Sequence, residues 1–219
     1  FAYPQFKSPN PQRKQFILRK RYWLYYALQL MSGARRQIFV VFAGFMMVEK
    51  FGFAVQEVTS LFLITLMANM VSAPLVGKAV SLFGERSALV FEYLGLAVIF
   101  LLYGGLYFFG WGVVLASALY VFNHIFFSLA LALKTYFQKI ADPRDIAPTA
   151  AVAFTINHIA AVFLPAGLGY LWLSSPQMVF LAAAGMALVS LVLALMIPRH
   201  PDEGNETIFM RIRATHLVE

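Results

Sequence analysis

Two adjacent arginines lie in the middle of a long, mainly apolar segment of this sequence. Arg35 and Arg36, followed by Gln37, fall near the centre of the segment 22–48. A charged side chain at the centre of a bilayer costs about 2.5–3.5 kcal/mol on insertion scales, so such residues normally face a protein interior or a water-filled cavity. Because a planar guanidinium binds carboxylate or phosphate through two parallel hydrogen bonds, the pair predicts an anion-binding site within a membrane.

The two arginines are not expected to share one site. Consecutive helical residues differ by about 100° in direction, so one guanidinium should face a cavity and the other a neighbouring helix. The nearest carboxylates in the sequence, Glu49 and Glu92, fall near the ends of their apolar segments. We therefore expect the partner of the arginines to lie outside this chain. It would be either a substrate anion or an acidic residue from another part of the protein.

Amide and imidazole side chains lie within three other apolar segments. The dipeptide Asn-His occurs twice, and a single Asn lies in a further segment. The functional interpretation is hydrogen bonding to a substrate, with His able to carry a proton because its unperturbed pKa is about 6.5. The alternative is hydrogen bonding between helices, which is common for Asn and His in membrane bundles. These candidate substrate-binding residues are Asn69, Asn123, His124, Asn157 and His158.

No catalytic motif accompanies these residues. The sequence contains no Gly-x-Ser-x-Gly, no His-Glu-x-x-His and no Gly-rich loop followed by Lys-Ser or Lys-Thr. His124 and His158 could ligate a metal together, but the sequence offers no third ligand beside them. We therefore expect neither a metal nor a cofactor, and we do not predict an enzyme.

The amino-acid composition indicates that the helices carrying these residues lie in a membrane. The chain is 61% hydrophobic and 12% charged, with a mean hydropathy of +0.73. A soluble domain has about 25% charged residues, and a helix needs roughly 20 apolar residues to cross a bilayer. We therefore expect an all-α, polytopic membrane protein with six transmembrane helices. Their expected ranges are 22–48, 58–76, 88–108, 112–133, 149–173 and 178–197.

The polar residues lie at similar depths if these six segments are helices. At a rise of 1.5 Å per residue, Arg35 lies about 20 Å into the first helix. Asn69, Asn123 and Asn157 lie about 12–18 Å into theirs. Helices one, two, four and five are therefore expected to line a cavity, and helices three and six are expected to support them from outside.

Basic residues are distributed unevenly between the two sides of these segments. If the N-terminus is inside, the inside segments hold fourteen Lys and Arg residues and the outside segments hold only Lys50. The positive-inside rule then places both termini in the cytoplasm, with the chain in an inner or plasma membrane. The net charge of +7 follows from this topology, so no nucleic-acid partner is expected. We expect a basic cytoplasmic loop at 1–21 and a cytoplasmic tail at 198–219.

The segment 77–86 resembles a known transporter motif. It is similar to the cytoplasmic loop motif of the major facilitator superfamily, Gly-x-Leu-x-Asp-Arg-x-Gly-Arg-Arg. The stretch 165–169, Pro-Ala-Gly-Leu-Gly, is similar to the Pro- and Gly-rich part of the family's eleventh helix. In the loop motif Gly77, Gly84 and Arg86 match, whereas Ser81, Leu82 and Glu85 depart from it.

The resemblance covers essentially the whole chain and implies the second half of a twelve-helix transporter. Such a half contains two three-helix repeats of inverted topology, with a binding site near the middle of the membrane. The implied partners are the lipid bilayer, an N-terminal six-helix half and a small, anionic organic solute moved by alternating access. The alternative is a self-sufficient six-span protein that oligomerises as a channel or serves as a non-transporting scaffold.

Overall fold

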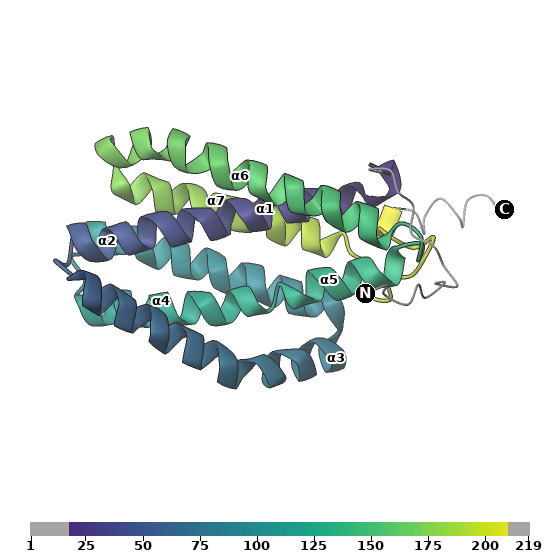
Figure 1. The fold of residues 1–219 in the computed structure, drawn as a ribbon, viewed down its shortest axis with the longest axis horizontal. Helices are drawn as coiled ribbons and strands as arrows, with labels where there is room; N and C mark the ends of the chain where they lie inside the picture. Colours follow the sequence, from purple (N-terminus) through teal and green to yellow (C-terminus); the bar gives the residue numbers. More distant parts are fainter. Residues whose placement is uncertain (1–17, 210–219) are drawn as a thin grey trace, which may run out of the picture.

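The computed structural model of this chain describes residues 18–209. In this range the chain forms a bundle of long helices that run side by side in alternating directions (Figure 1). The described residues contain no β-strand, and one isolated bridge pairs Asp202 with Asn205. The expected all-α class is therefore confirmed. Most of the loop expected at 1–21 and the end of the tail expected at 198–219 lie outside the described residues.

The first expected segment is one continuous helical rod with a local irregularity. A short 3₁₀ turn, η1 (Lys20–Tyr22), leads into α1 (Trp23–Ile38). The rod continues through a π-helical stretch, η2 (Phe39–Ala43), into α2 (Gly44–Glu49). π-Helical turns occur frequently at functional sites. This one begins directly after the segment that carries the two arginines.

The second and third expected segments both lie in α3 (Val55–Phe108), which is broken at one glycine. Gly84 has φ 79° and ψ 163°, a conformation that is essentially restricted to glycine, and both flanking stretches are helical. We call 55–83 the first limb of α3 and 85–108 the second limb. The chain folds back at this point, so the two limbs run in opposite directions (Figure 1). The gap expected between residues 76 and 88 is thus confined to Gly84, because the helix continues through Gly77.

The remaining helices follow the expected order with shifted ends. They are α4 (Val113–Ser128), α5 (Leu131–Ile140), α6 (Ile146–Ser174) and α7 (Pro176–Leu195). A single turn joins α4 to α5, so helical structure extends beyond the expected end at residue 133. Pro148 lies in the first turn of α6, where a missing N–H costs little.

Four helices are long and apolar enough to cross a membrane. They are α3, the α4–α5 stretch Val113–Ile140, α6 and α7. The helices of the first rod, α1, η2 and α2, are not among the four. These four helices make the chain compatible with a membrane protein.

Burial is unequal among the helices. The second limb of α3 packs against α7 through residues such as Phe100 and Phe180, both of which are fully buried. The first limb of α3 and α6 bury few side chains and expose long apolar faces. Met70, Tyr170 and Leu173 are each at least 80% exposed. Two helical stretches on opposite sides of the bundle therefore present apolar surface that nothing in the described chain covers (Figure 1).

Ion pairs join the chain segments at the end of the bundle where α1 begins and α7 ends (Figure 1). Arg21 binds Glu203 at 3.0 Å, and Lys139 binds Glu85 at 2.6 Å. Arg19 also pairs with Asp145. Partial burial opposes the charge of Arg21, but hydrogen bonds to Glu203 and Tyr22 leave its pKa above the ordinary value. We call this end, which also carries Arg86 and Arg199, the basic end.

Candidate functional site

The two arginines of α1 point into different surroundings. Arg35 is fully buried, whereas Arg36 is exposed. The side chains at adjacent helical positions differ by about 100° in direction, so the sequence predicts different surroundings for the two arginines. This difference in burial agrees with the prediction that the two guanidiniums do not both face one site.

Arg35 lies in the interior of the bundle between α1 and the second limb of α3. Its Nε donates a hydrogen bond to the carbonyl of Met31 at 3.2 Å, and its guanidinium carbon lies 4.3 Å from the ring centroid of Tyr93. Glu92 is also fully buried and interacts electrostatically with Arg35. The terminal nitrogens of Arg35 and both carboxyl oxygens of Glu92 have no hydrogen-bond partner among the described residues.

One carboxylate that the sequence places near a helix end nevertheless acts electrostatically on Arg35. It is Glu92 of the second limb of α3, although no ion pair within 4.0 Å joins the two side chains. A long helical side chain extends toward the N-terminus of its own helix, so its charge lies closer to that end than its Cα does. Arg35 thereby reaches the level of a carboxylate that the sequence places near a helix end. Its contacts are those of an interior residue that joins two helices.

Arg36 meets an amide from another helix. Its Nη2 donates a hydrogen bond to Oδ1 of Asn157 at 3.1 Å, and Nδ2 of Asn157 donates to the carbonyl of Gln29 at 3.3 Å. A Cβ atom added to Gly33 would lie 2.6 Å from the carbonyl oxygen of Asn157, so α1 and α6 cross in direct backbone contact. Among residues 18–209 no carboxylate lies within 4.0 Å of Arg36. A guanidinium has five N–H donors, and one hydrogen bond to Asn157 leaves others for an anion.

The other expected site residues lie in different surroundings. Asn123 is fully buried and Asn69 is half-buried, and neither side-chain oxygen has a hydrogen-bond partner among the described residues. His124 is half-buried, with its ring centroid 5.0 Å from that of Phe39 in η2. His158 is exposed, and its ring centroid lies 3.9 Å from that of Phe154 with the two ring planes tilted by 31°. Gln37 is half-buried.

The structure therefore brings only part of the expected set into contact. Arg36 and Asn157 form the polar centre of the α1–α6 crossing, and His158 is the next residue on α6. His124 comes near the first rod through Phe39 of η2, while Asn123 is buried in the interior. Within the described part of the chain, no group of three or more His, Cys, Asp or Glu side chains could hold a metal ion.

Sequence reasoning set Glu92 aside as a partner of Arg35 because it falls near the end of its apolar segment, and it missed Tyr93. The available signal was a lone acidic residue within the apolar segment 88–108. Of the three residues that match the transporter loop motif, Gly77 lies within the first limb of α3 and Gly84 forms the break. Arg86 begins the second limb and lines a cavity at the basic end.

Comparison with known proteins finds no relative of this chain. No family model matches the sequence, and no curated protein or solved structure matches it either. The placement of charged and polar side chains in the bundle is therefore the basis on which a function can be inferred.

Proposed function

We propose that this chain is the C-terminal half of a secondary transporter of the major facilitator type, which moves a small anionic organic solute by alternating access. The observation that carries the proposal is Arg36, an exposed guanidinium halfway along an apolar rod that has no carboxylate within 4.0 Å among the described residues. Charged groups within a membrane usually mark the pathway of a substrate or an ion. A solute with a carboxylate or phosphate group would supply the missing negative charge.

In this proposal the chain crosses the membrane six times. The rod formed by α1, η2 and α2 is the first span, the two limbs of α3 are the second and third, and α4–α5, α6 and α7 are the others. Spans one to three and four to six then form the two inverted repeats. The basic end faces the cytoplasm, because Arg and Lys residues gather there and, within residues 18–209, the opposite end carries only Lys50.

Arg36 would bind the solute's anionic group, and Asn157 would orient the guanidinium from α6. Gln37, His124 and His158 would contribute hydrogen bonds from the same or neighbouring helices. Arg35 is assigned a structural role instead, since Glu92 and Tyr93 surround it in the interior. Asn69 and Asn123 stay candidates for contacts that form when the bundle changes conformation.

The exposed apolar faces support the presence of a second half. The first limb of α3 and α6 bury few side chains, although both are long and apolar. Contact with an N-terminal six-helix half would cover these faces and place Arg36 beside the interface. Rocking of the two halves would then expose the solute to each side of the membrane in turn.

Uptake by the full protein reconstituted in vesicles tests this proposal. A panel of organic anions would be offered to the wild type and to the variants Arg36→Gln, Arg36→Lys and Lys50→Gln. We expect Arg36→Gln to abolish uptake of the transported anion, Arg36→Lys to retain part of it, and Lys50→Gln to behave as wild type. Normal uptake by Arg36→Gln would disprove the anion-binding role of this residue.

The exposed apolar faces also fit a second candidate function. A stand-alone six-span protein could cover the same faces with another copy of itself and act as a channel or a scaffold. The oligomeric state of the full protein in mild detergent distinguishes the two. A monomer with six further spans upstream supports the transporter, whereas a dimer of the six-span chain supports the alternative.

A further inference from the structure

An open cavity of about 540 Å³ lies at the basic end, next to the break in α3. It is bounded by the start of the second limb and by the end of α7. Its wall combines cationic or imidazole side chains at the rim with an apolar strip that continues along the second limb. The rim residues are Arg86, Arg199 and His200, and the strip consists of Val90, Phe91, Leu94 and Leu195.

The cations at the rim have no resident counter-charge. Glu85, the neighbour of Arg86, is only 4% exposed and pairs with Lys139 of α5 at 2.6 Å. None of the residues that line the cavity is acidic. In the described range, moreover, no carboxylate lies within 4.0 Å of Arg86 or Arg199. The cavity therefore has a local excess of positive charge.

The apolar strip faces outward. The exposed fractions of Phe91, Leu94 and Leu195 are 59%, 51% and 44%. All three belong to helices that are long and apolar enough to cross a membrane. The strip thus forms part of the surface that would contact lipid acyl chains.

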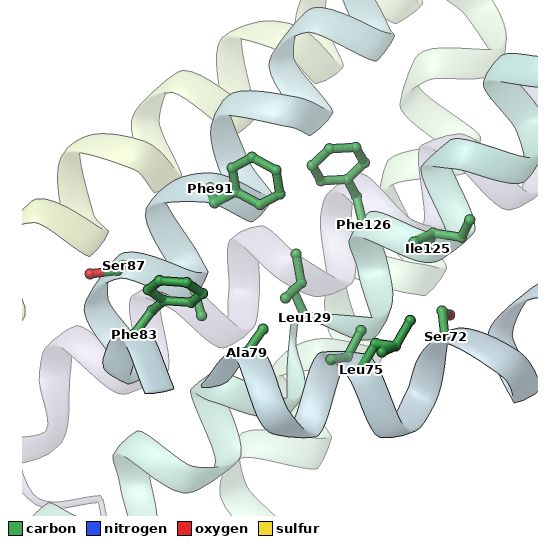
Figure 2. Close-up of a pocket in the computed structure, with 11 residues that line it drawn as sticks. Ser72, Leu75, Ala79, Phe83, Ser87, Phe91, Ile125, Phe126 and Leu129 are labelled. Carbon is green, nitrogen blue, oxygen red and sulfur yellow. The ribbon is translucent and has the colours of Figure 1, made fainter. Parts of the chain in front are cut away.

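A second cavity adjoins this strip and is almost entirely apolar. It has a volume of about 590 Å³ and lies between the two limbs of α3 and α4 (Figure 2). Phe91 and Phe126 stand on one side of it and Leu75 and Ala79 on the other (Figure 2). The two cavities share Phe83, Ser87 and Phe91 as lining residues.

The break at Gly84 adds to the attraction for an anion. The second limb begins immediately after it, and the first turn of a helix has N–H groups without intrahelical partners and a partial positive charge. Phosphate groups bind readily at such positions. Basic pockets between spanning helices at the cytoplasmic surface recognise the headgroups of anionic lipids.

We propose that this cavity binds an anionic phospholipid. The phosphate of the headgroup lies between Arg86 and Arg199, and one acyl chain follows Phe91 and Leu94. The second chain passes Phe83 into the apolar cavity of Figure 2. A soluble acidic partner would match the arginines but would leave the apolar strip uncovered. The site requires only that the chain spans a membrane, so it exists whether or not the protein carries a solute.

Lipid retention by the full protein tests the site. The protein would be reconstituted in phosphatidylcholine vesicles that contain a minor fraction of phosphatidylglycerol, and bound lipid would be identified by native mass spectrometry. Each Arg near an anionic surface contributes about a fivefold gain in binding, so Arg86→Gln with Arg199→Gln should weaken phosphatidylglycerol retention about 25-fold. The matched control, Lys134→Gln with Arg144→Gln, removes the same charge from exposed positions outside the cavity and should retain lipid as the wild type does.

A second variant keeps the test valid if the arginine variant does not fold. Leu94→Trp places a larger side chain in the cavity wall at a half-exposed position and leaves the charge unchanged. This variant should also reduce the retention of phosphatidylglycerol. Equal retention in the arginine variant and its control would overturn the proposal. Displacement of the lipid by inorganic phosphate alone would also overturn it, because the apolar strip would then contribute nothing.

Discussion

Arg36 and Asn157 are hydrogen-bonded at 3.1 Å, although 121 residues separate them in the sequence. The bond joins the rod that carries the arginines to α6, a helix that is otherwise poorly buried. Gly33 lies one turn before Arg36 and lets the two backbones meet. The position of the exposed guanidinium therefore depends on the fit between a glycine and an asparagine.

Gly33→Ala should separate α1 from α6. The added methyl group would lie 2.6 Å from the carbonyl oxygen and 2.8 Å from the side chain of Asn157, so backbone must move. Overpacking of this kind costs about 1–3 kcal/mol. Gly44→Ala is the matched control, because no atom lies within 4 Å of its Cβ position. Thermal unfolding in detergent should show a lower midpoint for Gly33→Ala only, and equal midpoints would contradict the close crossing.

Gly84→Ala should destabilise the protein, while Gly77→Ala should not. Gly84 has φ 79° and ψ 163°, and a side chain there costs about 1–3 kcal/mol of backbone strain. Gly77 is helical with open space around it, so alanine should be neutral or stabilising by up to about 1 kcal/mol. The same thermal measurement checks both variants. A stable Gly84→Ala protein would show that the fold-back of α3 does not need this conformation.

The buried pair of Arg35 and Glu92 should be visible in a double-mutant cycle. Removing one charge leaves the other buried without compensation, which typically costs about 3–5 kcal/mol. We expect Arg35→Gln and Glu92→Gln each to lower stability strongly, and the double variant to lose much less than the sum of the two. Additive effects, measured by denaturant unfolding, would mean that the two side chains do not interact.

Arg21→Gln should loosen the chain after α7. Arg21 holds Glu203 at 3.0 Å and also approaches Glu206 at 3.7 Å, so its loss removes both contacts. Limited proteolysis should then cleave within 199–209 faster than in the wild type. Lys20→Gln is the control, since this neighbouring side chain is exposed and makes no ion pair among the described residues. Equal cleavage rates in the two variants would mean that contacts other than those of Arg21 hold the segment 199–209 in place.

Much of the helical pattern could be predicted from the sequence, because apolar length and Gly or Pro breaks act locally. The break at Gly110 falls in the expected gap between 108 and 112. The expected gap 134–148 is reduced to the turn at 141–145, because α5 continues to Ile140 and α6 begins at Ile146. The break between the limbs of α3 is narrower than expected, because a glycine does not interrupt a helix where its backbone angles stay helical. Gly77 and Gly84 look alike in the sequence, and only Gly84 has that conformation.

The candidate site could be predicted only in part. The different orientations of Arg35 and Arg36 follow from helical geometry, so the sequence was sufficient for them. The partners of the arginines were not predictable, because Glu92 and Asn157 come from helices that are distant in the sequence. Depth counted along Cα atoms also ignores the reach of a long side chain, and this is why Glu92 was placed too far from Arg35.

The central claim is that Arg36, and not Arg35, presents its charge to a transported anion. This chain contains no cysteine, so Arg36→Cys and Arg35→Cys each introduce a unique thiol into it. The measurement is uptake by the full protein after treatment with a cationic or an anionic methanethiosulfonate reagent. The account predicts that only position 36 reacts, and that the cationic adduct restores uptake while the anionic one does not. Full uptake by unmodified Arg36→Cys, or reaction at position 35 alone, would contradict it.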